Sequence, residues 1–95
     1  MLKITEKQFL QQVTDLCKLL GYDYYHTWKS IHSPAGYPDL TIVKSPRLIF
    51  VELKIGKAKL TTFQEKWMQY FRDCGVESYV WRDTMWEEIV ECLKR

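Results

Sequence analysis

The fold of this 95-residue chain is decided by the stretch Leu48-Ile49-Phe50-Val51-Glu52-Leu53-Lys54. A short, almost wholly apolar run of this kind predicts a central strand that is buried on both faces. Side chains alternate along a strand, so Glu52 and Lys54 point the same way, roughly 7 Å apart (two rises of ~3.3 Å). Charged groups in a buried strand are costly unless they are paired or bound to a metal. The stretch therefore predicts both a strand and a polar site at its end.

A second acidic residue precedes this strand. Asp39 follows Pro38, thirteen residues before Glu52, at the expected start of the preceding strand. An aspartate at such a place is also common as a turn or strand-entry residue. Beside Glu52 and Lys54, it could instead complete a metal cluster with Glu52. The two carboxylates would then be the main ligands of Mg²⁺ or Mn²⁺, which prefer carboxylate and water oxygens.

Three motifs in this order resemble those of a known family: Gly36-Tyr37-Pro38-Asp39-Leu40, Val51-Glu52-Leu53-Lys54, and Leu60-Thr61-Thr62-Phe63-Gln64 with Trp67 following. They are similar to the PD-(D/E)xK nuclease superfamily and, within it, to the VRR-NUC branch of virus-type replication-repair nucleases. The resemblance runs from Glu6 to about Trp81. It implies a restriction-endonuclease-like core and a backbone carbonyl of Leu53 that completes the metal site. It also implies a homodimer that cuts branched DNA.

Patterning of the whole chain predicts one domain over residues 1–95. Helices are expected from Thr5 to Gly21, from Thr61 to Gly75 and over 84–94, because apolar residues recur there at helical spacing. Strands are expected over 22–28, 39–43, 47–55 and 76–81. The order α-β-β-β-α-β-α predicts an α/β fold, a three-layer sandwich with a central mixed β-sheet flanked by helices.

Each remaining site candidate has a structural alternative. Lys54 would orient the attacking water or stabilise charge on the phosphate, but it could be an ordinary surface lysine at a strand end. Gln64 would support the metal or its water, and it also fits a capping box with Thr61. Glu6 would join the metal site, as the resemblance implies, or simply favour the first turn of its helix through the macrodipole.

Basic residues flank the expected site on two loops. Lys57 and Lys59 follow the central strand, while Lys29 and His32 precede Asp39. Their positions predict contacts with DNA phosphates, which fix orientation and not sequence. Basic surface loops are common without such a role. His32 as a general base is a further alternative, although a bound metal could supply the nucleophile without it.

Composition limits the setting of the protein. The formal net charge of +2 is too small to indicate nucleic-acid binding by itself. The three cysteines Cys17, Cys74 and Cys92 form no CxxC pair and are expected to be reduced core residues of a cytoplasmic protein in a bacterial or phage-infected cell. We expect no membrane association, since no apolar run is long enough to span a bilayer.

The function expected from these residues is metal-dependent hydrolysis of DNA phosphodiester bonds, and the resemblance implies cutting of four-way (Holliday) junctions as a homodimer. Trp67, Tyr70 and Phe71 give the second helix an aromatic face that is expected to lie mostly in the core, and any exposed part would be a dimer contact. Two alternatives stay open. One is a monomeric flap or nicking nuclease, and the other is a non-catalytic DNA-binding module that retains the fold.

Overall fold

The computed structural model describes residues 3–28 and 31–95. Its helices are α1 (Glu6–Leu19), α2 (Thr62–Asp73) and α3 (Trp86–Lys94), and its strands are β1 (Asp23–His26), β2 (Leu40–Lys44), β3 (Arg47–Lys54) and β4 (Glu77–Arg82). A 3₁₀ turn at Asp83–Met85 precedes α3. The predicted order α-β-β-β-α-β-α is confirmed.

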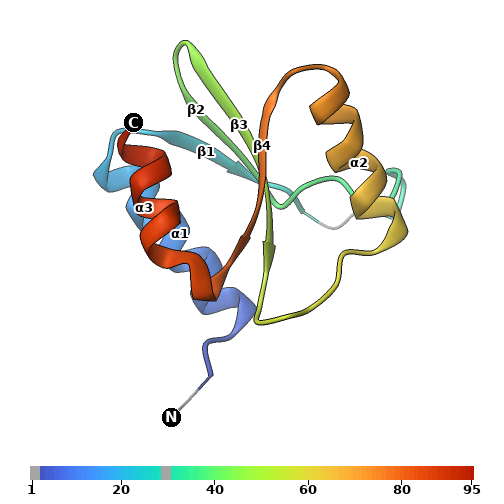
Figure 1. Ribbon diagram of the computed structural model, residues 1–95, viewed down its shortest axis with the longest axis horizontal. Coiled ribbons are helices and arrows are strands. Elements are labelled where there is room, and N and C mark those ends of the chain that lie inside the picture. The colour runs from blue at the N-terminus through green and yellow to red at the C-terminus, as the bar shows by residue number, and fades with distance from the viewer. Residues whose placement is uncertain (1–2, 29–30) are drawn as a thin grey trace.

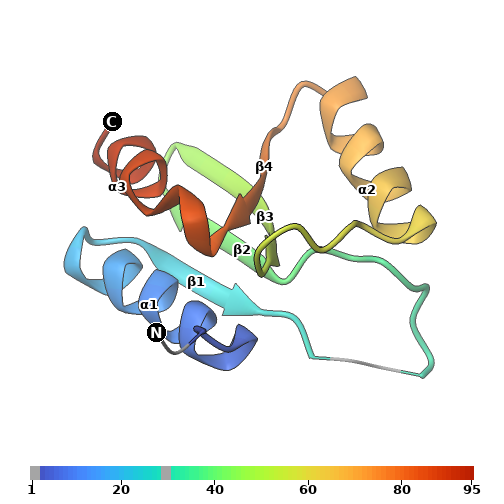
Figure 2. The ribbon, with the colours of Figure 1, turned by 60° about the horizontal axis from the view of Figure 1, so that its bottom comes forward.

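The four strands form one mixed sheet in the order β1-β2-β3-β4. The pairs β1/β2 and β2/β3 are antiparallel, while β3 and β4 are parallel because α2 connects them as a crossover. Helices α1 and α3 lie together on one face of the sheet, and α2 lies over the other (Figures 1 and 2). The three-layer arrangement expected from the sequence is therefore confirmed.

The main core lies between the sheet and the α1/α3 layer. Phe9 and Val13 of α1, Ile49 and Val51 of β3, and Ile89 of α3 are fully or almost fully buried there. Their spacing explains the fold, since α1 and α3 repeat apolar residues at helical intervals and β3 repeats them at every second position. The alternate residues of β3, including Glu52, face the other side of the sheet.

The layer under α2 is thinner and mostly aromatic. Phe50 of β3 stacks on Phe71 of α2 with ring centroids 4.4 Å apart, and Tyr37 meets Trp67 edge-on at 5.1 Å. Leu48, at the far end of the same face of β3, is 42% exposed. The expectation that β3 is buried on both faces is thus wrong at this end, because α2 covers only part of the sheet.

The core predictions for α2 and its C-cap are confirmed only in part. Trp67 and Phe71 are partly buried, whereas Tyr70 is 46% exposed, and Phe63 on the same helix is 58% exposed. Cys74, the C-cap residue, is exposed, while Cys17 and Cys92 are buried as expected. The apolar stripe of α2 is therefore wider than the part of the helix that the sheet covers.

Two element boundaries also differ from the expectation. The first strand covers only Asp23–His26, because the N–H of Tyr22 bonds to the carbonyl of Cys17 in the turn that ends α1 (2.8 Å). The last helix begins at Trp86 and not at Thr84. The carboxylate of Asp83 accepts a hydrogen bond from the N–H of Gly56 (2.7 Å) and so does not cap the helix.

A paired polar cluster closes one end of the sheet. The Arg47 guanidinium bonds to both carboxylate oxygens of Glu77 (2.8 and 2.5 Å), to the Tyr22 hydroxyl (2.8 Å) and to the Cys92 carbonyl (2.9 Å). These bonds hold the pKa of Glu77 below its ordinary value, chiefly through the hydrogen bond from Arg47. The cluster ties the first residue of β3 to β4 and to α3.

Within residues 3–28 and 31–95, no helix combines the length and the apolarity that crossing a bilayer requires.

Candidate active site

Asp39 and Glu52 meet at the end of the sheet opposite the Arg47 cluster. In the β2/β3 register Leu40 lies opposite Val51, so the next position places Asp39 opposite Glu52. The Asp39 carboxylate accepts a hydrogen bond from the backbone N–H of Leu53 (2.8 Å), which fixes its orientation. The two carboxylates predicted to act together are therefore brought together, on the face of the sheet that carries α2.

Glu52 occupies an unusual electrostatic position. Glu52 is only 2% exposed to solvent. Burial raises the pKa of Glu52 to about 9, assisted by the hydrogen bond and the negative charge of Asp39, while the cation of Lys54 and the backbone at Leu53 act in the opposite direction. Without a cation, burial and the nearby Asp39 thus favour the protonated form of Glu52. A divalent cation between the two carboxylates would favour the ionised form instead.

A pocket of about 620 Å³ opens over this acidic pair. It is lined by residues of the two inner strands, the end of β1, and the starts of α1 and α2: Glu6, Lys7, Leu10, Gln11, His26, Asp39, Glu52, Leu53, Lys54 and Gln64. All the residues predicted to be catalytic therefore line one cavity. They come from segments separated by up to 58 positions in the sequence, from Glu6 to Gln64.

Lys54 and the Leu53 carbonyl complete the strand end. Lys54 is partly buried, lies two residues after Glu52 and favours the ionised form of that carboxylate through its charge. The N–H and C=O of one strand residue point toward the same neighbouring strand. Since the N–H of Leu53 reaches Asp39, the Leu53 carbonyl faces the same side of β3 as that carboxylate. Two carboxylates and one carbonyl, all candidate oxygen ligands for a metal, therefore lie at this strand end together with the ammonium group of Lys54.

Gln64 has the capping role that the sequence allows. Its backbone N–H bonds to the Thr61 hydroxyl (3.1 Å), and its side-chain oxygen accepts from the Thr61 N–H (2.9 Å). The side chain is only partly buried and also lines the acidic pocket. The cap holds Gln64 at the edge of the pocket, so the two readings of this residue are compatible.

The loop that leads into Asp39 is held against the start of α2. Gly36 has a φ of +92°, and a Cβ there would lie within 2.8 Å of the Gln64 backbone nitrogen. The indole N–H of Trp67 donates to the Ala35 carbonyl (3.2 Å). Only glycine fits this close approach of two backbones. The contact sets where Pro38 and Asp39 enter the sheet.

Glu6 lies at the rim of the pocket and is exposed. Its place in the first turn of α1 agrees with the macrodipole reading, and the Thr5–Gln8 capping box beside it is present. Among the residues that the structure describes, no three His, Cys, Asp or Glu side chains are grouped closely enough to hold a metal ion by themselves. The acidic pair therefore stands without a third carboxylate in the described part of the chain.

Several pocket residues were missed by the sequence analysis. Lys7 and Gln11 are four apart on α1, which places them on one helix face next to Glu6. His26 ends β1, and the N–H of Thr27 bonds to the Asp39 carbonyl (2.8 Å). The Thr27 hydroxyl is buried and has no hydrogen-bond partner within residues 3–28 and 31–95. His26 could have been found only from the register of β1 on β2, which the sequence alone does not give.

The predicted DNA-contacting residues that the structure describes are not among those that line the pocket. Lys57 and Lys59 are exposed on the loop that follows β3, and His32 is exposed in the loop after β1. Lys29 falls outside the described residues. The lysine pair is therefore adjacent to Lys54 along the chain but not part of the acidic cavity.

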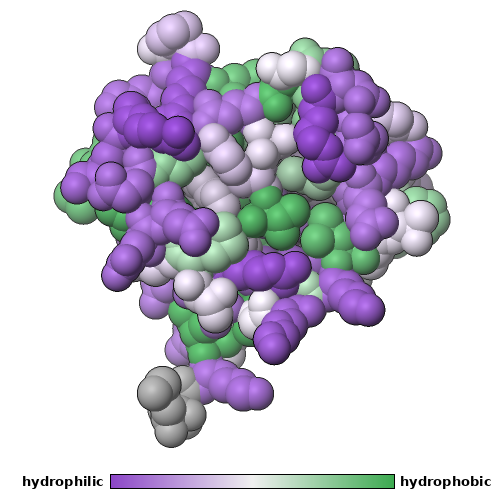
Figure 3. Space-filling view, viewed as in Figure 1, coloured by the Kyte–Doolittle hydropathy of each residue, from purple (hydrophilic) through white to green (hydrophobic). Residues whose placement is uncertain are grey.

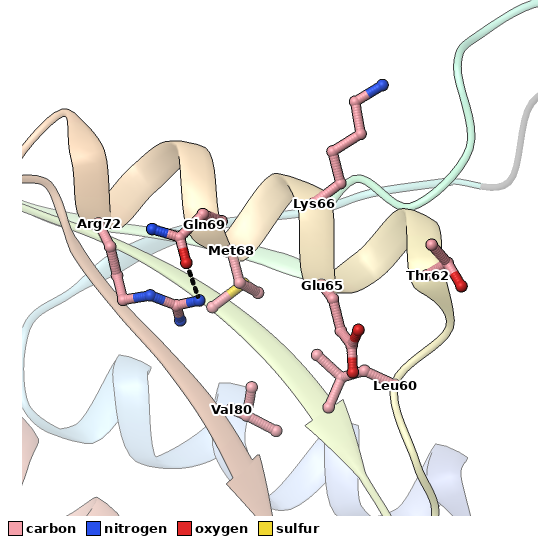
Figure 4. Close-up of a pocket in the computed structure, with 8 residues that line it drawn as sticks. All are labelled: Leu60, Thr62, Glu65, Lys66, Met68, Gln69, Arg72 and Val80. Carbon is pink, nitrogen blue, oxygen red and sulfur yellow. Dashed lines mark hydrogen bonds between the residues drawn. The ribbon is translucent and has the colours of Figure 1, made fainter.

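A second hollow of about 600 Å³ lies between α2 and β4 (Figure 4). Its floor is apolar, with Met68 and Val80 facing each other, and Arg72 at its rim is bonded to Gln69 (2.9 Å). Figure 3 shows hydrophobic atoms gathered between the two polar flanks of the molecule, where β4 runs in Figure 1. No like charges are forced together in this hollow, so the acidic pocket is the candidate active site.

Comparison with known proteins agrees with the fold class. The sheet order and the helices on its two faces are those of the α/β fold that the motifs predict. Residues 4–94 match the VRR-NUC domain, and the chain belongs to that family.

Two solved structures share the fold. A VRR-NUC domain structure superposes with a TM-score of 0.77 at 20% identity, covering 95% of each chain. The Holliday junction resolvase Hjc of Archaeoglobus fulgidus superposes with a TM-score of 0.61, also at 20% identity, over 80% of this chain and 66% of that one. No relative was found among the curated proteins.

Proposed function

We propose that this protein is a metal-dependent endonuclease that hydrolyses DNA phosphodiester bonds, with one nuclease domain over residues 1–95. The observation that carries the proposal is the opposition of Asp39 and a buried Glu52 on neighbouring strands, with Lys54 on the same face as Glu52. A purely structural cluster would pair opposite charges. Here a partly buried aspartate lies beside a buried glutamate, which is unfavourable for stability unless a cation is bound.

The donors present fit Mg²⁺ or Mn²⁺. Asp39, Glu52 and the Leu53 carbonyl would hold the ion, with water in its other positions, since Mg²⁺ in proteins often uses only one or two carboxylates. Glu6 at the rim is a further candidate ligand. When bound, the ion lowers the pKa of a water ligand and offsets charge on the phosphate.

The remaining pocket residues act on the substrate and the water. Lys54 orients the attacking water or stabilises the charge that develops on the phosphate, because its ammonium lies beside the acidic pair. Gln64, held by its cap, offers a side-chain amide at the cavity edge. Lys57, Lys59 and His32 would contact phosphates outside the cavity, and Lys29 is a further candidate for a phosphate contact.

We further propose that the substrate is a four-way junction and that the active form is a two-fold homodimer. Likeness in fold to the resolvase Hjc supports the substrate. The exposure of Phe63 and Tyr70 on α2 supports an apolar contact between subunits. Two sites related by a two-fold axis could make paired cuts. The protein would act in the cytoplasm, where the free thiols of Cys17 and Cys92 stay reduced.

The test is cleavage of labelled four-way junction, flap and linear duplex, with Mg²⁺, with Mn²⁺ and with chelator. Asp39→Asn and Glu52→Gln should abolish most cleavage while the fold is retained. Lys54→Ala should abolish turnover and leave metal affinity largely intact by calorimetry. Glu65→Gln, a change at an exposed carboxylate, is the matched control.

Three outcomes would change the proposal. Wild-type cleavage by either acidic variant would refute the proposed site. A monomer by light scattering that still cuts flaps would favour the nicking-nuclease alternative. DNA binding without cleavage under any metal would favour a non-catalytic module.

A further inference from the structure

The loop that follows β3 is hydrogen-bonded to Arg82 at the end of β4 and to Asp83 in the turn after it. Nη1 of Arg82 donates to the carbonyls of Gly56 (3.0 Å) and Ala58 (2.7 Å). On the other side, the N–H of Gly56 donates to the Asp83 carboxylate (2.7 Å). Arg82 can reach the loop because it lies opposite Lys54 in the parallel β3/β4 register. Three hydrogen bonds thus attach a surface loop to the sheet.

This attachment determines which groups the loop presents to solvent. The carbonyls of Gly56 and Ala58 turn inward to the guanidinium, and the N–H of Ala58 closes a turn onto the Ile55 carbonyl (3.1 Å). Gly56 adopts a φ of +56°, which favours glycine. The exposed side chains of Lys57 and Lys59 are left on the outside. The loop therefore exposes the side chains of Lys57 and Lys59 to solvent, while its carbonyl oxygens at Gly56 and Ala58 accept hydrogen bonds from Arg82.

We infer that residues 56–59 form a preformed binding site for a DNA backbone phosphate, shaped by Arg82 and Asp83 as positioning residues. The inference rests on the proposed function and deepens it. Lys54, Lys57 and Lys59 follow one another along the end of β3 and this loop, and Arg82 is bonded to the loop backbone. Because Lys54 lines the acidic pocket and the loop follows it directly, the bound phosphate belongs to the strand being cut and flanks the scissile one.

A preformed loop lowers the cost of binding, since Lys57 and Lys59 lose less freedom when a phosphate arrives. Arg82 is bonded to backbone carbonyls in the free protein, so it acts through the loop and not on the phosphate. Its effect must then depend on the two lysines being present. A residue that contacts DNA itself, or that only supports the fold, would act independently of them.

The experiment measures the Kd for labelled duplex and four-way junction in chelator, where no cleavage takes place. Lys57→Ala with Lys59→Ala should weaken binding about tenfold and reduce the salt slope by about 0.9 for each lost phosphate contact. Arg82→Ala should weaken binding severalfold in the wild-type background, and by less than about twofold when both lysines are already absent. In Mg²⁺ or Mn²⁺, Arg82→Ala should raise KM and leave kcat nearly unchanged.

Controls separate positioning from general instability. Arg72→Ala removes a cation whose guanidinium is bonded to Gln69 on the same helix, away from the loop, and should leave the Kd unchanged. Should Arg82→Ala unfold the protein, the pair Asp83→Ala and Asp83→Asn carries the same test, because asparagine keeps an acceptor for Gly56. The alanine variant should weaken binding and the asparagine variant should restore it.

The two proposals fail in different ways. If the wild type binds no DNA, the proposed nuclease function is wrong. If it binds but the lysine variants bind equally well, the loop is no phosphate site. If the effects of Arg82→Ala and of the lysine variants simply add, Arg82 does not position the loop and the inference is overturned.

Discussion

Glu52 should make the stability of the metal-free protein fall as pH rises. The pKa of this carboxyl is raised from 4.5 to about 9 in the folded protein, chiefly by burial and then by Asp39. Below about pH 4.5 both the folded and the unfolded chain hold the proton, so Glu52 contributes no pH dependence. Between that value and about pH 9 the unfolded chain has lost the proton and the folded chain retains it. Stability therefore decreases across this window.

The size of the effect follows from one proton. The free energy of unfolding can fall by at most about 1.4 kcal/mol for each pH unit in the window. In a domain of this size, 1 kcal/mol moves the Tm by roughly 4–8 °C. A fall in Tm on the order of 10 °C is therefore expected between about pH 6 and pH 8 in chelator. Glu52→Gln cannot ionise and should lose this slope.

The assay is thermal unfolding by circular dichroism across the pH range, with chelator and with Mg²⁺ or Mn²⁺. The matched control Glu88→Gln, at an exposed position on α3, should keep the wild-type slope. A divalent ion should raise the Tm of the wild type more at high pH than at low pH, and should not raise that of Glu52→Gln in this way. An identical slope in Glu52→Gln and the wild type would refute the reasoning.

Three other changes test the supporting structure. Gly36→Ala should destabilise the protein by more than about 1 kcal/mol, because a Cβ there collides with the α2 backbone; denaturant unfolding measures it, and an unchanged midpoint would contradict the close approach. Gln64→Ala and Thr61→Ala should each cost about 1 kcal/mol by the loss of the cap. Only Gln64→Ala should also slow cleavage by the folded enzyme, and equal cleavage by both would leave Gln64 a capping residue alone. The bond with Arg47 lowers the pKa of Glu77, so the stability that this bond contributes is lost as pH falls through that pKa. Glu77→Gln should therefore be less stable than the wild type at neutral pH, and the difference should shrink on acidification. Equal acid unfolding curves for the two proteins would exclude this role.

The central strand and its motif were predictable because their signals are local. An apolar run that ends in Glu52 and Lys54 predicts a strand, its central position in the sheet and the shared face on which the two charged side chains lie. The capping boxes at Thr5 and Thr61 were also readable, since each needs only a spacing of three residues. The order of elements then restricted the architecture to helices on both faces of a mixed sheet.

The exposure of α2 was not predictable from its sequence. An apolar stripe shows which side of a helix seeks a partner, but not how much of that side the partner covers. Phe71 meets Phe50, while Phe63 and Tyr70 extend past the contact. Likewise, His26 reaches the pocket only through the pairing of β1 with β2, and long-range register leaves little trace in one sequence.

The two polar clusters of the sheet show how structural and functional charge can be told apart. At one end, Arg47 faces Glu77, so opposite charges satisfy each other and lower the pKa of the acid. At the other end, Asp39 faces Glu52, and the pKa of the buried acid rises. The first arrangement is complete in the protein alone. The second arrangement is more favourable with a proton or a bound cation between the two acids, and that requirement supports the proposal that it is a metal site.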